Sequence, residues 1–195
     1  AKLGMDENRV KLFKVTGVDV ECAIIGGGYI MPLSCWENNT SITYWEDSVC
    51  NFTRLNVFRK ASNMKYCIMN KVVTVSTGSS HIFEGCTSLK KILLPECTRF
   101  GGYYMLNNVP FDIFYGPKMI TAFGDSVGND VCFNINGTGA LILNTALQTC
   151  NSGQPDGDLQ NAVTRGYQVR YVTNFTPPNT VTNLSTGTIY NTAVQ

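Results

Sequence analysis

An internal repeat constrains the fold of this chain more than any other feature of its sequence. Residues 83–95 and 105–117 align when one is shifted by 22 positions, with large apolar residues in the same places and a proline as the last residue of each segment. A period of this length is typical of a solenoid, in which each repeat buries its apolar face against its neighbours. The chain is therefore expected to present an extended surface for contacts.

The repeat extends in both directions, but the step, the number of residues between equivalent positions, changes along the chain. A backward shift of 25 positions brings residues 58–70 onto the same pattern. A second backward shift of the same size reaches Leu33, Trp36, Ile42 and Tyr44, with Asn39 in the main leucine position. A forward shift of 22 positions reaches Val127, Asp130 and Phe133, with Asn136 in the isoleucine position. We expect about five units, the outer two degraded because terminal repeats face solvent on one side.

Each unit is predicted to contain a short helical or turn segment followed by a short strand. In the unit that fits best, these are residues 83–89 and 92–94, and Pro95 ends the strand. The stacked strands would form one parallel sheet that lines one face of the array. The predicted repeat core consists of the recurring apolar positions Phe58, Met64, Cys67, Phe83, Leu89, Ile92, Leu94, Met105, Phe111 and Phe114.

The segments that flank the repeats have different patterns. Residues 9–31 alternate and are rich in β-branched residues, so residues 1–32 are predicted to form an N-terminal β cap. Residues 33–173 would form the repeat domain with a C-terminal cap, and residues 174–195 a proline-containing linker and the first strands of a truncated second domain. The C-terminal cap is expected to contain a strand, a helix and a final strand at residues 139–147, 158–166 and 167–173. The predicted fold class is an α/β-type repeat solenoid with short parallel strands, and we expect the natural protein to continue.

Composition limits the kinds of partner that the chain can have. Hydrophobic residues make up 44% of the chain and charged residues 15%, and the net charge is +1. A near-neutral chain has no electrostatic footprint for nucleic acid, and no apolar run approaches the roughly 18 residues of a membrane span. We therefore expect no nucleic-acid partner and no membrane insertion. Scarce charge and abundant Asn, Thr, Ser and Gly are typical of extracellular and virion proteins.

The eight cysteines are spaced irregularly and form no CxxC pair. Cys67 occupies the repeat position of Ile92 and Phe114, and Cys86 occupies the position of Ala61 and Asn108. Since a free cysteine behaves as a small buried hydrophobe, we expect buried free thiols, with one or two disulfides as the open alternative. One histidine and no paired ligands argue against a metal site.

No motif in the sequence indicates catalysis. His81, the only histidine, follows Gly-Ser-Ser and is expected to be a solvent-exposed turn residue rather than a general base. The glycine run at 26–28 lacks the spacing of a phosphate loop and predicts a turn. Adjacent Glu46 and Asp47 would point to opposite faces of a strand. We expect no catalytic residue, no cofactor and no enzymatic activity.

Aromatic residues give the best indication of a binding surface. Tyr103, Tyr104 and Tyr115 belong to one unit and lie outside its apolar repeat positions. Exposed aromatic rings can stack on glycans or anchor a protein partner. Packing beneath the return loops is the alternative for these tyrosines. We take the three residues as the candidate binding surface.

The segment Phe83–Pro95 resembles the BspA-type leucine-rich repeat, which combines an aromatic residue, a Gly-Cys pair, Thr-Ser-Leu and a strand ending in Leu-Pro. The resemblance covers residues 33–136, and residues 150–159 resemble the segment that closes such arrays. Residues 177–184 resemble the opening strand of a fibronectin type III domain. This combination is similar to surface proteins of Bacteroides-group bacteria and to tail or fibre proteins of their phages. The family acts in adhesion and recognition and has no shared catalytic residue.

The resemblance implies a noncatalytic structural or recognition module of a phage virion, in a tail, fibre or other receptor-contacting component. Its partners would be proteins of the same assembly, or a receptor or glycan on the host surface, and a homo-oligomer is left open. One alternative is an adhesin or glycan-binding protein, on a bacterial cell surface or secreted. Another is an accessory domain of a larger secreted enzyme.

Overall fold

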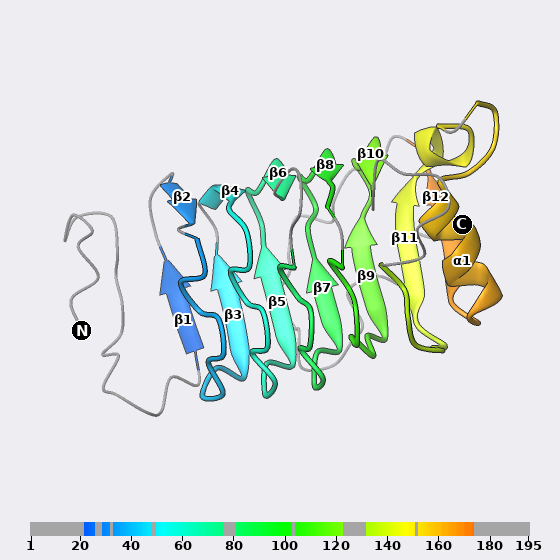
Figure 1. Ribbon diagram of the computed structural model, residues 1–195. Coiled ribbons are helices and arrows are strands. Elements are labelled where there is room, and N and C mark those ends of the chain that lie inside the picture. Colours follow the sequence, from blue (N-terminus) through cyan, green and yellow to red (C-terminus); the bar gives the residue numbers. More distant parts are fainter. Residues whose placement is uncertain are drawn as a thin grey trace.

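The repeat folds into a parallel β-solenoid of about four turns with very little helix (Figure 1). Each turn of the solenoid contributes one strand to each of two parallel sheets. A hydrogen-bonded reverse turn then leads into the next turn of the solenoid. The computed structural model describes residues 22–25, 29–31, 33–47, 50–75, 81–102, 104–122, 132–150 and 152–173, and of residues 22–25, 29, 30 and 122 it describes the backbone alone.

The first sheet has seven parallel strands, and neighbouring strands belong to successive turns. Their order across the sheet is β1 (Cys22–Ile25), β3 (Tyr44–Asp47), β5 (Tyr66–Met69), β7 (Lys91–Leu93), β9 (Ile113–Gly116), β11 (Ala140–Asn144) and β12 (Gln168–Val172). Strand β1 lies within the predicted N-terminal cap and pairs in register with β3, so it continues the sheet. Side chains alternate across this sheet, so that Cys67 faces the interior and Ile68 the exterior.

A second parallel sheet runs beside the first, so the expectation of a single sheet is wrong. Its strands are β2 (Tyr29–Met31), β4 (Cys50–Thr53), β6 (Thr74–Val75), β8 (Arg99–Phe100) and β10 (Thr121–Ala122). Three of these strands contain only two residues, too short for an alternation of apolar and polar side chains to be visible in the sequence. The register between turns holds them in place, with Thr74 opposite Arg99 and Arg99 opposite Thr121.

The segments predicted to be helical or turn-like are turns, so the fold is a β-solenoid rather than an α/β array. Each of these turns reaches a residue with positive φ: Asn38 at 60°, Lys60 at 58°, Gly85 at 72° and Asn108 at 58°. A left-handed residue ends a helix after its first turn. The described helices are the 3₁₀-helix η1 (Thr145–Gln148) and the α-helix α1 (Gly157–Thr164).

Aromatic rings run through the core from turn to turn. Trp45 lies between Trp36 and Phe58, with ring centroids 5.2 and 5.1 Å away. Phe58 and Phe83 then stack at 5.8 Å, and Phe100 and Phe114 continue the series. We call Trp36, Trp45, Phe58, Phe83, Phe100 and Phe114 the aromatic spine. All ten residues of the predicted repeat core are buried.

The strand register corrects the predicted step at the front of the array. Tyr44 pairs with Tyr66, so the step is 22 positions and the predicted step of 25 is wrong. This step places Ile42, not Asn39, in the leucine position with Met64, and Ile42 is fully buried. Asn39 lies near a turn, where its Oδ1 accepts hydrogen bonds from the backbone N–H groups of Ser41 and Ile42 at 2.9 and 3.1 Å.

At the other end of the array the predicted step of 22 is too short. Phe114 pairs with Leu141, so the step there is 27 positions, and Leu141 rather than Asn136 takes the isoleucine position. Asn136 is exposed. The predicted closing strand is present as β11, but it ends at Asn144, whose side chain caps η1. The predicted helix is α1, with Asp156 as its N-cap instead of Asp158.

Some expectations fall outside the described residues. They include the strands expected at 9–21, the units around Val127 and Asp130, and the linker and fibronectin-like strands at 174–195. These remain predictions.

The cysteine thiols that the structure describes are free, as the irregular spacing predicts. All seven cysteines whose side chains are described lack a disulfide, and five of them are buried. Burial raises the pKa of Cys50, Cys86 and Cys97 to about 12, because the interior disfavours the thiolate. The thiolate is the reactive species, so these thiols are expected to be inert in the folded chain.

We expect iodoacetamide at pH 8 to alkylate Cys150 first, because Cys150 is exposed and the buried thiols are shielded and un-ionised. Peptide mass spectrometry over a time course measures the order of modification. In a denatured control the described cysteines should react at similar rates. Equal rates at Cys150 and Cys97 in the native chain would contradict the buried-thiol assignment.

Candidate recognition surface

The returning turns stack into a third side of the solenoid, which we call the turn face (residues 33–38, 55–60, 82–85 and 104–108). Backbone hydrogen bonds join successive turns: Trp36 N–H donates to Val57 at 2.9 Å, and Phe58 N–H donates to Ile82 at 3.1 Å. The turn face is therefore as regular as a sheet, and equivalent side chains lie in rows along it.

One row of the turn face is an ion-paired ladder. The Nε of Arg59 donates to Glu84 Oε2 at 2.6 Å, and its Nη1 lies 3.4 Å from Glu37 Oε1. These three residues come from three successive turns. The hydrogen bond with Glu84 raises the pKa of the Arg59 guanidinium. The three side chains are 20–30% exposed, so the ladder is accessible to solvent and fixes the rotamers of its members more than it stabilises the fold.

A stacked pair of rings lies beside this ladder. The imidazole of His81 and the ring of Tyr104 are 5.0 Å apart and nearly parallel, with an interplanar angle of 5°. The Nδ1 of His81 lies 3.0 Å from Glu84 Oε2, which links the ring pair to the ladder. Tyr104 is 38% exposed, so this arrangement presents an aromatic ring to solvent from an ordered support.

The ladder continues toward the C-terminal end through asparagine side chains. Asn134 Oδ1 accepts the backbone N–H of Asn108 at 2.7 Å, and Asn134 Nδ2 donates to Asn108 Oδ1 at 3.0 Å. Arg165, just after α1, donates to the backbone carbonyl of Asn134 at 3.1 Å. The turn face thus presents charged, aromatic and amide groups in sequence along the solenoid axis.

The three candidate tyrosines do not form one site. Tyr103 lies outside the described residues, and Tyr104 is exposed on the turn face. Tyr115 is only 2% exposed and projects from the outer side of the first sheet. The sequence interpretation missed Arg59 and Glu84, although their separation of 25 residues equals the step between those turns and could have paired them.

His81 differs in part from its expected role. It lies at the start of a turn, as expected, but its side chain is 25% exposed and is held between Tyr104 and Glu84. The described residues contain no group of three His, Cys, Asp or Glu side chains that could hold a metal ion. None of the helices in the described ranges is long and apolar enough to cross a membrane.

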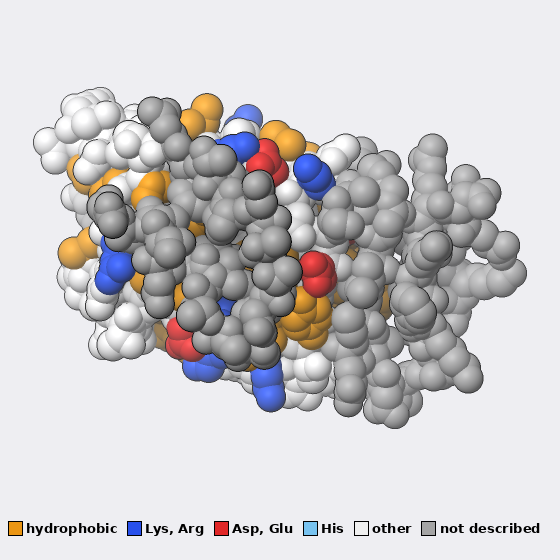
Figure 2. Space-filling model, turned by 180° about the vertical axis from the view of Figure 1, so that it is seen from behind, with side chains coloured by type: hydrophobic (Ala, Val, Ile, Leu, Met, Phe, Trp, Pro, Cys, Tyr) orange, Lys and Arg blue, Asp and Glu red, His pale blue; other side chains and the backbone are white. Residues whose placement is uncertain are grey.

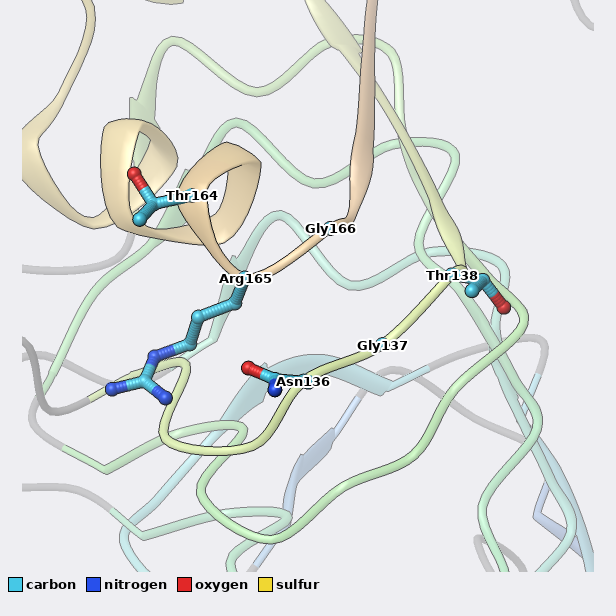
Figure 3. A pocket seen from close by; sticks show the side chains of 6 residues that line it. All are labelled: Asn136, Gly137, Thr138, Thr164, Arg165 and Gly166. Carbon is cyan, nitrogen blue, oxygen red and sulfur yellow. The ribbon is translucent and has the colours of Figure 1, made fainter.

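An open hollow of about 560 Å³ lies where α1 meets the last turn (Figure 3). Its lining consists of Asn136, Gly137, Thr138, Thr164, Arg165 and Gly166. Arg165 is its one charged residue, and its guanidinium donates to Asn161 Oδ1 and to the Asn134 carbonyl at 3.2 and 3.1 Å. Arg165 therefore fastens α1 to the solenoid, and the hollow is a seam between these parts.

On the side that Figure 2 shows, blue basic and red acidic side chains are scattered instead of gathered into a patch of one sign. Comparison of the chain with protein-family models, with curated proteins and with solved structures found no match. The case for a function therefore depends on the turn face and on the sequence.

Proposed function

We propose that this chain is a noncatalytic recognition module whose turn face contacts a protein or a glycan. The observation that carries the proposal is the exposed Tyr104 ring, which is stacked on His81 beside the ladder of Arg59 and Glu84. Tyrosine and arginine, with tryptophan, are enriched among the residues that dominate binding energy at interfaces. An ordered ring also loses little conformational entropy when a ligand binds.

The architecture supports a role in contact rather than in chemistry. Stacked turns present equivalent side chains in rows, and such extended surfaces are what solenoids use for binding. On this surface an aromatic ring can stack on the apolar face of a sugar, while Glu37 and Arg59 offer an acceptor and donors to its hydroxyl groups. The same groups would suit a polar protein surface.

We propose further that the turns are leucine-rich repeats of the BspA type. The support is the segment Phe83–Pro95, which carries the aromatic, Gly-Cys and Leu-Pro positions of that unit, and whose Gly85 has the positive φ that ends the turn. The proposed location is a phage virion, in a tail, fibre or other receptor-contacting component. The low charge and the fibronectin-like pattern at 177–184 support it, and a bacterial cell-surface adhesin is the alternative.

We expect Tyr104→Ala to weaken binding to the ligand by about 2 kcal/mol, roughly 30-fold in Kd, as for an aromatic hot spot. The full chain would be screened on an array of bacterial-surface and host-surface glycans and against intact bacterial cells. Affinity for each hit would then be measured for both variants.

Ile120→Ala is the matched control, since Ile120 is 57% exposed and lies just before the second-sheet strand β10, outside the turn face. Its affinity should equal that of the unchanged chain. Absence of any hit, or equal effects of the two substitutions, would overturn the role of the turn face. Mass spectrometry of purified virions tests the location, because the cell-surface alternative predicts the chain in the cell envelope instead.

A further inference from the structure

A row of large apolar side chains crosses the outer side of the first sheet. Ile68, Leu93, Tyr115 and Ile142 lie opposite one another on β5, β7, β9 and β11, one residue from each strand. They form a cluster separate from the core, together with Val172 at the end of β12. We call these four aligned residues the outer row. A contiguous apolar row on the exterior of a sheet indicates an interaction surface.

The outer row is covered. Ile68 is 0% exposed, Leu93 1%, Tyr115 2% and Ile142 5%. Neighbouring strands cover the flanks of such side chains but leave their ends open, because side chains stand perpendicular to a sheet. Every described residue of this cluster belongs to the first sheet itself, and the apolar side chains of α1 belong to the core. The described apolar residues outside the first sheet therefore do not account for this burial.

From these observations we infer that the outer row is the docking surface for residues 174–195 of this chain. This segment contains apolar residues in its two strand-like runs, Val181–Ile189 and 192–195, and no charged residue at all. Residues 1–21, the other long segment outside the described ranges, carry eight charged side chains. An uncharged segment is the better match, because burying a charge against an apolar row is costly.

The path of the chain fits this assignment. β12 ends at Val172, which belongs to the same cluster, so the chain leaves the sheet beside the outer row. From β12 to β5 is four strand spacings, about 19 Å. The segment 174–195 can span up to about 70 Å when extended. The internal segments 76–80 and 123–131 instead follow strands of the second sheet.

The test places the photoreactive p-benzoylphenylalanine at position 115 of the full chain. The tyrosine ring at that position is kept, and a benzoyl group replaces its hydroxyl and projects from the outer side of the sheet. After irradiation, peptide mass spectrometry should show crosslinks from position 115 to residues 174–195 within the same molecule. Crosslinks to residues 1–21, crosslinks between two copies, or no crosslink would each overturn the inference.

Two comparisons sharpen the result. The same group at the exposed position 120 should give no crosslink to 174–195. The double substitution Leu184→Asn and Ile189→Asn should remove the crosslink from position 115 while leaving the circular dichroism of the solenoid unchanged. A crosslink that persists at full yield in this variant would contradict docking through apolar contacts.

Discussion

Phe58→Ala is expected to lower the free energy of unfolding by about 3–5 kcal/mol, the usual cost of removing a buried phenylalanine ring. Phe58 is fully buried in the middle of the aromatic spine, with Trp45 on one side at 5.1 Å and Phe83 on the other at 5.8 Å. Its loss leaves a cavity between successive turns, and each turn is stabilised mainly by its neighbours. Urea denaturation followed by circular dichroism measures the change.

Leu33→Ala provides the control for this prediction. Leu33 is 56% exposed, so its truncation should change the free energy of unfolding by no more than about 0.5 kcal/mol. The chain has two tryptophans, Trp36 and Trp45, and both lie in the spine, so intrinsic fluorescence gives a second probe of the same transition. Similar costs for the two substitutions would show that Phe58 is not a packing centre.

The central turns of the fold could be predicted from the sequence because their steps are uniform. Cys67, Ile92 and Phe114 lie opposite one another, as the repeat predicts. At the N-terminal end of the array the predicted step of 25 residues was too long, and it put Asn39 in the position that Ile42 occupies. A polar residue in an apolar position was the sign of that error, since an apolar residue three positions away restores the pattern. The second sheet could not be predicted, because two-residue strands carry no periodic signal.

The candidate surface was predicted less well, because the sequence interpretation did not take into account the side of the sheet to which each side chain points. Phe114 faces the core, so period-two alternation sends the adjacent Tyr115 to the opposite side of the sheet, away from Tyr104. His81 and Tyr104, whose rings stack, are separated by 23 positions. Paired residues of the neighbouring strands β7 and β9 are separated by 22 positions, so the turn face contains one extra residue there. The hydrogen bond from the backbone N–H of Phe83 to the carbonyl of Met105 lies in the same part of the turn face as this extra residue. Such insertions in turns are invisible in a single sequence.

Gly139→Ala is expected to destabilise the chain by about 1–3 kcal/mol, as overpacking does where the surrounding backbone cannot move. A Cβ at Gly139 would overlap the carbonyl oxygen of Phe111 and lie 3.1 Å from its carbonyl carbon. The backbone there is fixed on both sides, because Gly139 C=O accepts from Gln168 N–H at 2.9 Å and Ala140 N–H donates to the backbone carbonyl of Asp112 at 2.8 Å. The clash therefore falls on the junction of β9, β11 and β12.

Gly101→Ala is the matched control, because a Cβ at Gly101 would meet no atom within 4 Å. There the substitution restricts the unfolded chain without straining the folded one, so a gain of about 0.4–1 kcal/mol is expected. The two glycine substitutions should thus have opposite signs in the same urea denaturation measurement. If Gly139→Ala were instead neutral or stabilising, β9 and β11 could not approach as closely as the register requires. The longer step from Phe114 to Leu141, which joins the last turn to the solenoid, would then be wrong.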